Sequence, residues 1–121
     1  MRVKLIYYYL PYCRACDEFE RNVIKPLYKR GDIDLIKVNV ETEREIRELR
    51  LPMSNVNHKL HYDAICRKSD CVVPAVEIVM KETEDYYESK FIFTTGDEKK
   101  FERDVINSVE SISMLAGVVV Y

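Results

Sequence analysis

Residues 3–16 read VKLIYYYLPYCRAC, and the rest of the fold can be worked out from this segment. Its first eight residues are apolar or aromatic except for Lys4, which is typical of a strand buried on both faces. Residues 11–13 are expected to form a turn, and from residue 14 the apolar positions recur every four residues, as in a helix. Cys13 and Cys16 therefore lie where a buried strand passes into a helix.

The predicted helix extends to about residue 30. Its apolar positions Phe19, Val23 and Leu27 are four residues apart and would cover one face of a sheet. Pro26 should kink this helix or begin its final turn, because proline has no donor N–H and its ring clashes with the preceding turn. Gly31 is expected to end the helix, since glycine readily adopts the left-handed conformation found there.

The remaining pattern predicts strands and helices in alternation. A strand-helix-strand unit requires a parallel crossover, and two late strands joined by a short turn must pair antiparallel. The expected fold class is α/β, with one domain over residues 1–121 and a mixed four-stranded sheet that has helices on both faces. The further elements are a strand over 33–40, helices over 41–51 and 57–68, strands over 72–80 and 87–94, and a final helix opened by a capping box at 95–98.

Composition and charge exclude several classes of protein. The chain has 121 residues, of which 47% are hydrophobic, enough for one packed domain. Its net charge of -2 does not fit a nucleic-acid-binding protein, and its apolar runs are too short to cross a bilayer. We therefore expect no nucleic-acid or membrane partner and a cytoplasmic location. The lack of Gln and Trp beside plentiful Lys and Glu is typical of a thermophilic source.

The motif CRAC at residues 13–16 carries the chemistry. Unpaired backbone N–H groups at a helix N-terminus stabilise a thiolate, which is the nucleophilic form of cysteine. Cys13 would sit at that position, and Arg14 would add a positive charge beside it. Cys16 follows one helical turn later, close enough to close a small disulfide ring. A C-x-x-C pair can also be half of a zinc site, but zinc half-sites usually lie on loops or hairpin turns.

The element order and this motif resemble the thioredoxin-fold family, and glutaredoxins most closely, because the first strand leads directly into the cysteines. A second shared motif is Val73-Pro74 at the beginning of the third strand, where the family has a cis peptide bond facing the active cysteines. The resemblance implies a dithiol–disulfide oxidoreductase with Cys13 as nucleophile, Cys16 as resolving thiol, and no metal or organic cofactor. The residues implied to contact the substrate are Tyr12, Arg14, Val73 and Pro74. Disulfide-containing protein or small-molecule substrates, and a recycling reductase or glutathione, are the implied partners.

Several positions depart from the family pattern. Thioredoxins have Trp where this chain has Tyr12, and a buried Asp where it has Tyr7. Glutaredoxins commonly have Pro-Tyr between the cysteines, where this chain has Arg14 and Ala15, so the direction of electron flow stays open. Residues 95–97 match the glutathione-holding segment of glutaredoxins only in part, and a helix cap is the preferred interpretation.

Cys66 and Cys71 form a second pair shortly before Pro74. The preferred interpretation is a structural disulfide that pins the loop before the proline. Two alternatives are a redox relay to the first cysteine pair and a zinc site that includes His58 and His61 or the first pair. A structural or zinc-binding role for all four cysteines would make the protein a non-catalytic binding module on a thioredoxin scaffold.

The C-terminal residues 117–121 read GVVVY. Their β-branched side chains follow a glycine that should end the last helix, so we expect a short strand. Such a strand would pair with a sheet edge of this chain or of a second copy, which would give a dimer.

Overall fold

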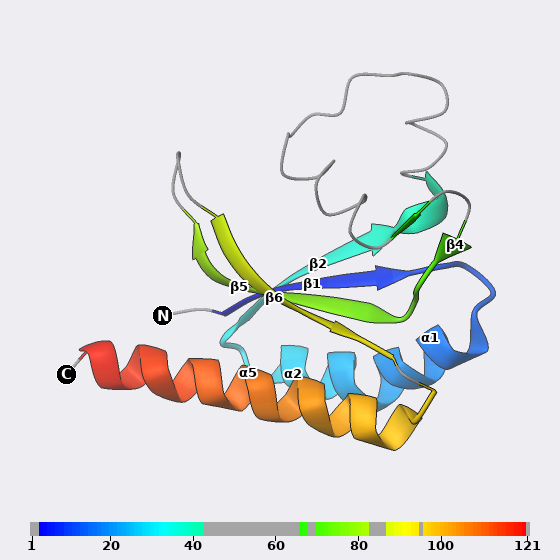
Figure 1. Cartoon of the computed structure of the whole chain (residues 1–121). Helices are drawn as coiled ribbons and strands as arrows, with labels where there is room; N and C mark the ends of the chain where they lie inside the picture. Colours follow the sequence, from blue (N-terminus) through cyan, green and yellow to red (C-terminus); the bar gives the residue numbers. More distant parts are fainter. Residues whose placement is uncertain (1–2, 43–65, 68–69, 83–86, 95, 121) are drawn as a thin grey trace.

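The computed structural model describes residues 3–42, 66–67, 70–82, 87–94 and 96–120 (Figure 1). The longer elements follow the order expected from the sequence, and a short hairpin is added before the third long strand. In chain order, the elements are β1 (Val3–Tyr9), α1 (Arg14–Phe19), the π-helical segment η1 (Glu20–Ile24), α2 (Lys25–Lys29), β2 (Ile33–Asn39), β3 (Cys66–Arg67), β4 (Asp70–Cys71), β5 (Ala75–Glu82), β6 (Tyr87–Phe93) and α5 (Glu98–Val120).

The four longer strands form one mixed sheet in the order β2-β1-β5-β6. β1 and β2 are parallel, with Val3 opposite Ile33, because a helix connects them. β5 is antiparallel to both β1 and β6, and its pairing with β1 ends where Tyr8 lies opposite Ala75. The predicted fold class, an α/β fold with a mixed four-stranded sheet, is confirmed.

One face of the sheet is covered by α5 and by the continuous helical stretch from α1 to α2 (Figure 1). Alternate residues of β1, Leu5 and Tyr7, point into this core and are nearly inaccessible to solvent. The core is closed by apolar side chains from the helices and from β5, which include Phe19, Val23, Leu27, Val76, Ile78, Phe101 and Val105. This is the face on which the first helix, and with it the cysteine pair, is fixed.

The opposite face has its own buried cluster around Ile6 and Tyr8 of β1 and Val38 of β2. The Tyr8 hydroxyl donates a hydrogen bond of 2.8 Å to the carboxylate of Glu77, which is fully buried. The helix predicted over 41–51 lies outside the described residues, apart from a first turn at 40–42. That turn is capped by the side chain of Asn39, whose oxygen accepts the N–H of Glu41 at 3.0 Å.

The first helix continues through Pro26 by changing its winding. A π-helical segment precedes the proline, which lies in the first turn of α2. Of the two outcomes expected at Pro26, a kink or the beginning of the final turn, the structure has the proline near the start of α2, the last segment of the helix. Gly31, with φ of 84°, follows the helix end and donates to the Tyr28 carbonyl at 3.2 Å.

Residues 66–67 form a strand, whereas the sequence pattern predicted a helix over 57–68. β3 and β4 pair as a short antiparallel hairpin, with Cys66 opposite Cys71 and Arg67 opposite Asp70. The prediction was wrong here because the helical pattern stopped short of residue 66, and strand pairing across two residues depends on a partner rather than on local propensity. The rest of the predicted helix lies outside the described residues.

Helix α5 begins and ends later than predicted. Asp97 is its cap, and its carboxylate accepts the N–H of Lys100 at 3.1 Å, so the predicted box at 95–98 places the cap two residues too early. The helix runs to Val120, and the short strand expected after residue 117 is wrong. A valine's preference for strands is mostly packing on a sheet and is weak where the helix can simply add another hydrogen bond. In the described part of the chain, no helix is both long and apolar enough to span a membrane.

Candidate functional site

The turn between β1 and α1 presents Tyr12 directly before the cysteine pair. This side chain is fully exposed, and its backbone has φ of 60°. A bulky non-glycine residue is uncommon in the left-handed region, and such conformations cost free energy. Backbone strain of this kind is concentrated at functional sites, so the turn is a candidate site on conformational grounds as well as chemical ones.

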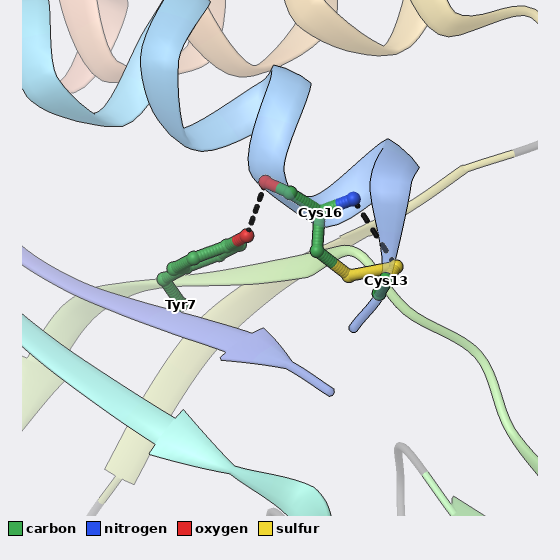
Figure 2. Close-up of a disulfide and its surroundings, with 3 residues drawn as sticks. All are labelled: Tyr7, Cys13 and Cys16. Atoms are coloured by element: carbon green, nitrogen blue, oxygen red, sulfur yellow. Dashed lines mark hydrogen bonds between the residues drawn. A yellow bond between two sulfur atoms is a disulfide. The ribbon is translucent and has the colours of Figure 1, made fainter. Parts of the chain in front are cut away.

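Cys13 is the N-cap of α1, as the sequence predicted. Its sulfur accepts the backbone N–H of Cys16 at 3.1 Å, and its carbonyl accepts the N–H of Asp17 at 3.0 Å. The two cysteines are joined in a disulfide, with their Cα atoms 5.2 Å apart (Figure 2). One sulfur therefore occupies the place where a helix N-terminus offers an unpaired donor to a negative charge.

The two sulfur-bearing residues differ in exposure. Cys13 is half-buried at the surface end of the turn, whereas Cys16 is 1% exposed and faces the core. An incoming disulfide can therefore approach only Cys13 without rearrangement of the helix. Among the described residues, no group of three or more His, Cys, Asp or Glu side chains could hold a metal ion.

Arg14 lies at the surface with 93% of its side chain exposed. Its guanidinium pairs with Glu18 one turn later, at 3.2 Å. A charge that is exposed and already paired acts weakly on its neighbours, because water and salt screen it. The hydrogen bond from the Cys16 N–H, and not Arg14, is therefore the main local feature that favours a Cys13 thiolate.

The peptide bond between Val73 and Pro74 is cis, as the family resemblance implies. Pro74 is buried and shares a small hollow with Ala15 of the CRAC motif, so the fold brings together two predicted motifs that are far apart in the sequence. Val73 precedes β5 and lies beyond the last residue of β5 that pairs with β1. Its backbone is therefore placed at the end of the sheet that is next to the cysteines.

The same hollow has an acidic lining that the sequence did not reveal. Three carboxylates line it: Glu18 from α1, and Glu98 and Glu102 from the first turns of α5. Glu102 also accepts a hydrogen bond from Asn22 at 3.2 Å. No sequence signal could have grouped these residues, because they come from helices about 80 residues apart that meet only in the folded chain.

Tyr7 is the second feature of the site that sequence reasoning left unassigned. It occupies the position at which thioredoxins have a buried Asp, and its hydroxyl donates a hydrogen bond of 2.8 Å to the Cys16 carbonyl (Figure 2). Burial, followed by the nearby charges of Glu20 and Asp17, raises the pKa of this phenol well above its usual value. Tyr7 is therefore a neutral donor at the site, whereas an acid would be a titrating group.

Cys66 and Cys71 lie directly opposite each other on the β3–β4 hairpin. Residues opposite each other on antiparallel strands have Cα separations within the range that a disulfide spans. The predicted disulfide itself concerns side chains outside the described part of the structure, and it stays a prediction. His58 and His61, and with them the zinc alternative, also lie outside the described residues.

Comparison with solved structures shows a thioredoxin-like fold. A thioredoxin of Trichomonas vaginalis matches with a TM-score of 0.50 and 17% identity, over 87% of this chain and 78% of that one. A malarial protein matches with a TM-score of 0.48 and 16% identity, over 92% and 97% of the two chains. No family model and no curated protein sequence matches this chain. At such low identity the likeness shows the fold, and the activity has to be argued from the site.

Proposed function

We propose that this protein is a dithiol–disulfide oxidoreductase that works through Cys13 and Cys16. The observation that carries the proposal is their disulfide at a helix N-terminus, with Cys13 half-buried at the surface and Cys16 buried. A purely structural disulfide needs neither the exposed turn before it nor a donor aimed at its outer sulfur. The thioredoxin-like fold is consistent with this function but does not establish it.

The catalytic cycle begins from the reduced pair, with Cys13 as thiolate and Cys16 as thiol. The Cys13 sulfur attacks a substrate disulfide, whose S–S bond breaks as one substrate thiolate leaves. The Cys16 sulfur then attacks Cys13 in the mixed disulfide, the second substrate thiolate leaves, and the Cys16 proton passes to it. The substrate gains two electrons, and the protein reaches the Cys13–Cys16 disulfide seen in the structure.

The surroundings of the pair support these roles. The Cys16 N–H at 3.1 Å stabilises charge on the Cys13 sulfur, both before attack and when Cys13 is the leaving group. Cys16 is shielded from other disulfides by the core, so it reacts with the neighbouring mixed disulfide instead.

Substrate contacts are expected around the rim of the turn. The exposed Tyr12 ring offers an apolar surface, and the Val73 backbone beside Pro74 can bond a substrate segment in the manner of an added strand. The substrate class is therefore a disulfide within an extended polypeptide. A reductase or glutathione would return electrons to the pair, and the cycle requires no metal or organic cofactor.

Trapping of the mixed disulfide tests the proposal. The Cys16→Ser variant should form a stable covalent adduct with a reducible protein disulfide such as insulin, because attack survives and resolution is lost. The Cys13→Ser variant should form none, since its remaining thiol is buried. Non-reducing electrophoresis and mass spectrometry distinguish the two, and trapping by both variants or by neither would contradict the assigned roles.

The reduction potential of the Cys13–Cys16 couple distinguishes a catalytic protein from the alternative, a non-catalytic binding module on the same scaffold. Structural disulfides typically have potentials below about −300 mV, whereas catalytic pairs lie higher. Thiol counting before and after reduction, together with a zinc assay, completes the comparison. A potential in the structural range, or stoichiometric zinc with no disulfide, would favour the binding module.

A further inference from the structure

Tyr7 connects the sheet to the helical turn that carries Cys16. It lies in β1, opposite Lys37 of β2 and Val76 of β5, so its backbone is flanked by paired strands on both sides. From there the phenol reaches across the core, and its hydroxyl meets the Cys16 carbonyl at 2.8 Å (Figure 2). The contact joins a rigid element to the backbone of the proposed resolving cysteine.

The carbonyl that Tyr7 contacts makes an imperfect bond within its own helix. The N–H of Glu20 is shared between the carbonyls of Cys16 and Asp17, and Glu20 is where the winding changes from α to π. A shared N–H gives each carbonyl a weaker bond than an unshared one. The Tyr7 hydroxyl therefore supplies the Cys16 carbonyl with a second partner at a place where the helix itself holds it loosely.

The position of the hydroxyl is well defined. The Tyr7 ring is 1% exposed and lies between Tyr9, at 5.6 Å between ring centroids, and Phe19, at 5.7 Å. A ring that is buried and packed against two other rings has little freedom to move, so little entropy is lost when its hydrogen bond forms.

We propose that Tyr7 is a positioning residue for the resolving step. Its hydroxyl holds the Cys16 backbone so that the Cys16 sulfur stays within reach of the Cys13 sulfur while the substrate occupies the site. The inference rests on the function proposed above and adds a residue to it. In the resolving step the Cys16–Cys13 bond forms as the Cys13–substrate bond breaks, and a fixed nucleophile raises the effective concentration of one thiol near the other.

The role of Tyr7 is one of geometry and not of proton transfer. The hydroxyl contacts the Cys16 carbonyl, and the charged groups that act on it are Glu20 and Asp17 of the first helix, of which Glu20 pairs with Lys37 of β2. Burial, followed by the negative charges of Glu20 and Asp17, raises the phenol's pKa, so it keeps its proton throughout the neutral range. It can donate to the carbonyl at every pH at which the exchange runs, but it cannot accept the Cys16 proton.

The Tyr7→Phe variant tests the inference, with Tyr8→Phe as its matched control. Tyr8 is the next residue of the same strand, is equally buried, and donates at 2.8 Å to Glu77 on the opposite face of the sheet. Single-turnover kinetics should show resolution of a mixed disulfide slowed about fivefold in Tyr7→Phe, the effect of one hydrogen bond, and unchanged in Tyr8→Phe. The Cys13–Cys16 potential should become less negative by about 20 mV in Tyr7→Phe only, which is the same fivefold change converted at 29.6 mV per tenfold.

Two further measurements separate positioning from other roles. In a Cys16→Ser background, Tyr7→Phe should leave the rate of Cys13 attack unchanged, because only the second step uses the side chain of residue 16 and the Tyr7 hydroxyl bonds the carbonyl of that residue, not the N–H that faces Cys13. The ratio of resolution rates with and without the hydroxyl should be constant between about pH 5 and pH 9, since the phenol does not titrate there. A ratio that changes with pH, or a slower first step, would overturn the positioning role.

If Tyr7→Phe and Tyr8→Phe slowed the resolving step equally, Tyr7 would be a general contributor to stability and not a positioning residue. If Tyr7→Phe left the rate of that step unchanged, the inference would also be overturned. If Tyr7→Phe fails to fold, Tyr7→Met removes the hydroxyl with a more adaptable side chain and is measured in its place. Failure of the proposed function appears differently, because the unsubstituted protein would then show no disulfide exchange at all.

Discussion

The Cys13 thiol should be more acidic than a free cysteine. Its sulfur accepts the Cys16 N–H at 3.1 Å at the N-terminus of a helix, and both features favour the thiolate. We expect its pKa in the Cys16→Ser variant to lie below the free value of about 8.5. The rate of alkylation by iodoacetamide, followed against pH, gives this value directly.

Arg14→Ala serves as the control for this measurement. The Arg14 side chain is 93% exposed and paired with Glu18. Arg14→Ala should therefore change the pKa of the Cys13 thiol only slightly, because most of the lowering is expected from the helix N-terminus. A Cys13 midpoint at or above the free-thiol value would remove the basis for its role as nucleophile. A large change in Arg14→Ala would instead restore the charge effect that the sequence suggested.

The β3–β4 hairpin should carry a structural disulfide between Cys66 and Cys71. The two residues are register partners on adjacent strands, and the hairpin leads into the segment that ends at Pro74. Cys66→Ser should therefore lower the melting temperature while disulfide exchange by Cys13 and Cys16 is largely kept. Closing so short a loop contributes only about 2 kcal/mol, so the loss should be modest.

The matched variants for the hairpin are Cys71→Ser and the double variant. If the two sulfurs form one bond, each single variant and the double variant should lose the same stability, because breaking the bond once removes the whole effect. In a redox titration with thiol mapping by mass spectrometry, the Cys13–Cys16 disulfide should be reduced before the Cys66–Cys71 disulfide. If Cys66→Ser kept full stability but lost turnover, the redox relay would be favoured. If the stability losses of the two single variants added up in the double variant, Cys66 and Cys71 would not share a bond.

The folded molecule holds its site through an aromatic cluster that spans three elements. Phe19 of the first helix packs on Tyr7 of β1 and, with centroids 4.6 Å apart, on Phe101 of α5. Phe101 is 3% exposed, so Phe101→Ala should cost about 3–5 kcal/mol of unfolding free energy. Urea denaturation measures the loss.

Phe93→Ala is the control for Phe101→Ala, because it removes the same ring from a residue that is 37% exposed on β6. Its cost should be about 1 kcal/mol or less. Comparable losses of unfolding free energy in the two variants would show that the aromatic cluster between α5 and the first helix contributes no more to stability than an exposed ring does.

Local patterns in the sequence were sufficient for the order of elements, the sheet class and the position of the cysteines. Residues 3–10 are apolar without alternation, residues 14–30 repeat every four, and the CRAC motif lies between them, so each conclusion used neighbours along the chain. The implied cis bond before Pro74 came from the family resemblance and is present in the structure. Element ends were less well predicted, as the late cap at Asp97 shows, because several residues in a row were competent to cap.

Tertiary structure alone decided how these parts meet. The Tyr7 hydroxyl reaches the Cys16 carbonyl, Pro74 lies beside Ala15, and carboxylates from α1 and α5 line one hollow. The pairing of Cys66 with Cys71 across the β3–β4 hairpin was likewise decided by the tertiary structure. Sequence periodicity tells which face of an element is buried, but not which atoms of another element it meets. Those contacts depend on the relative placement of elements that are far apart along the chain, and packing across the whole core sets that placement.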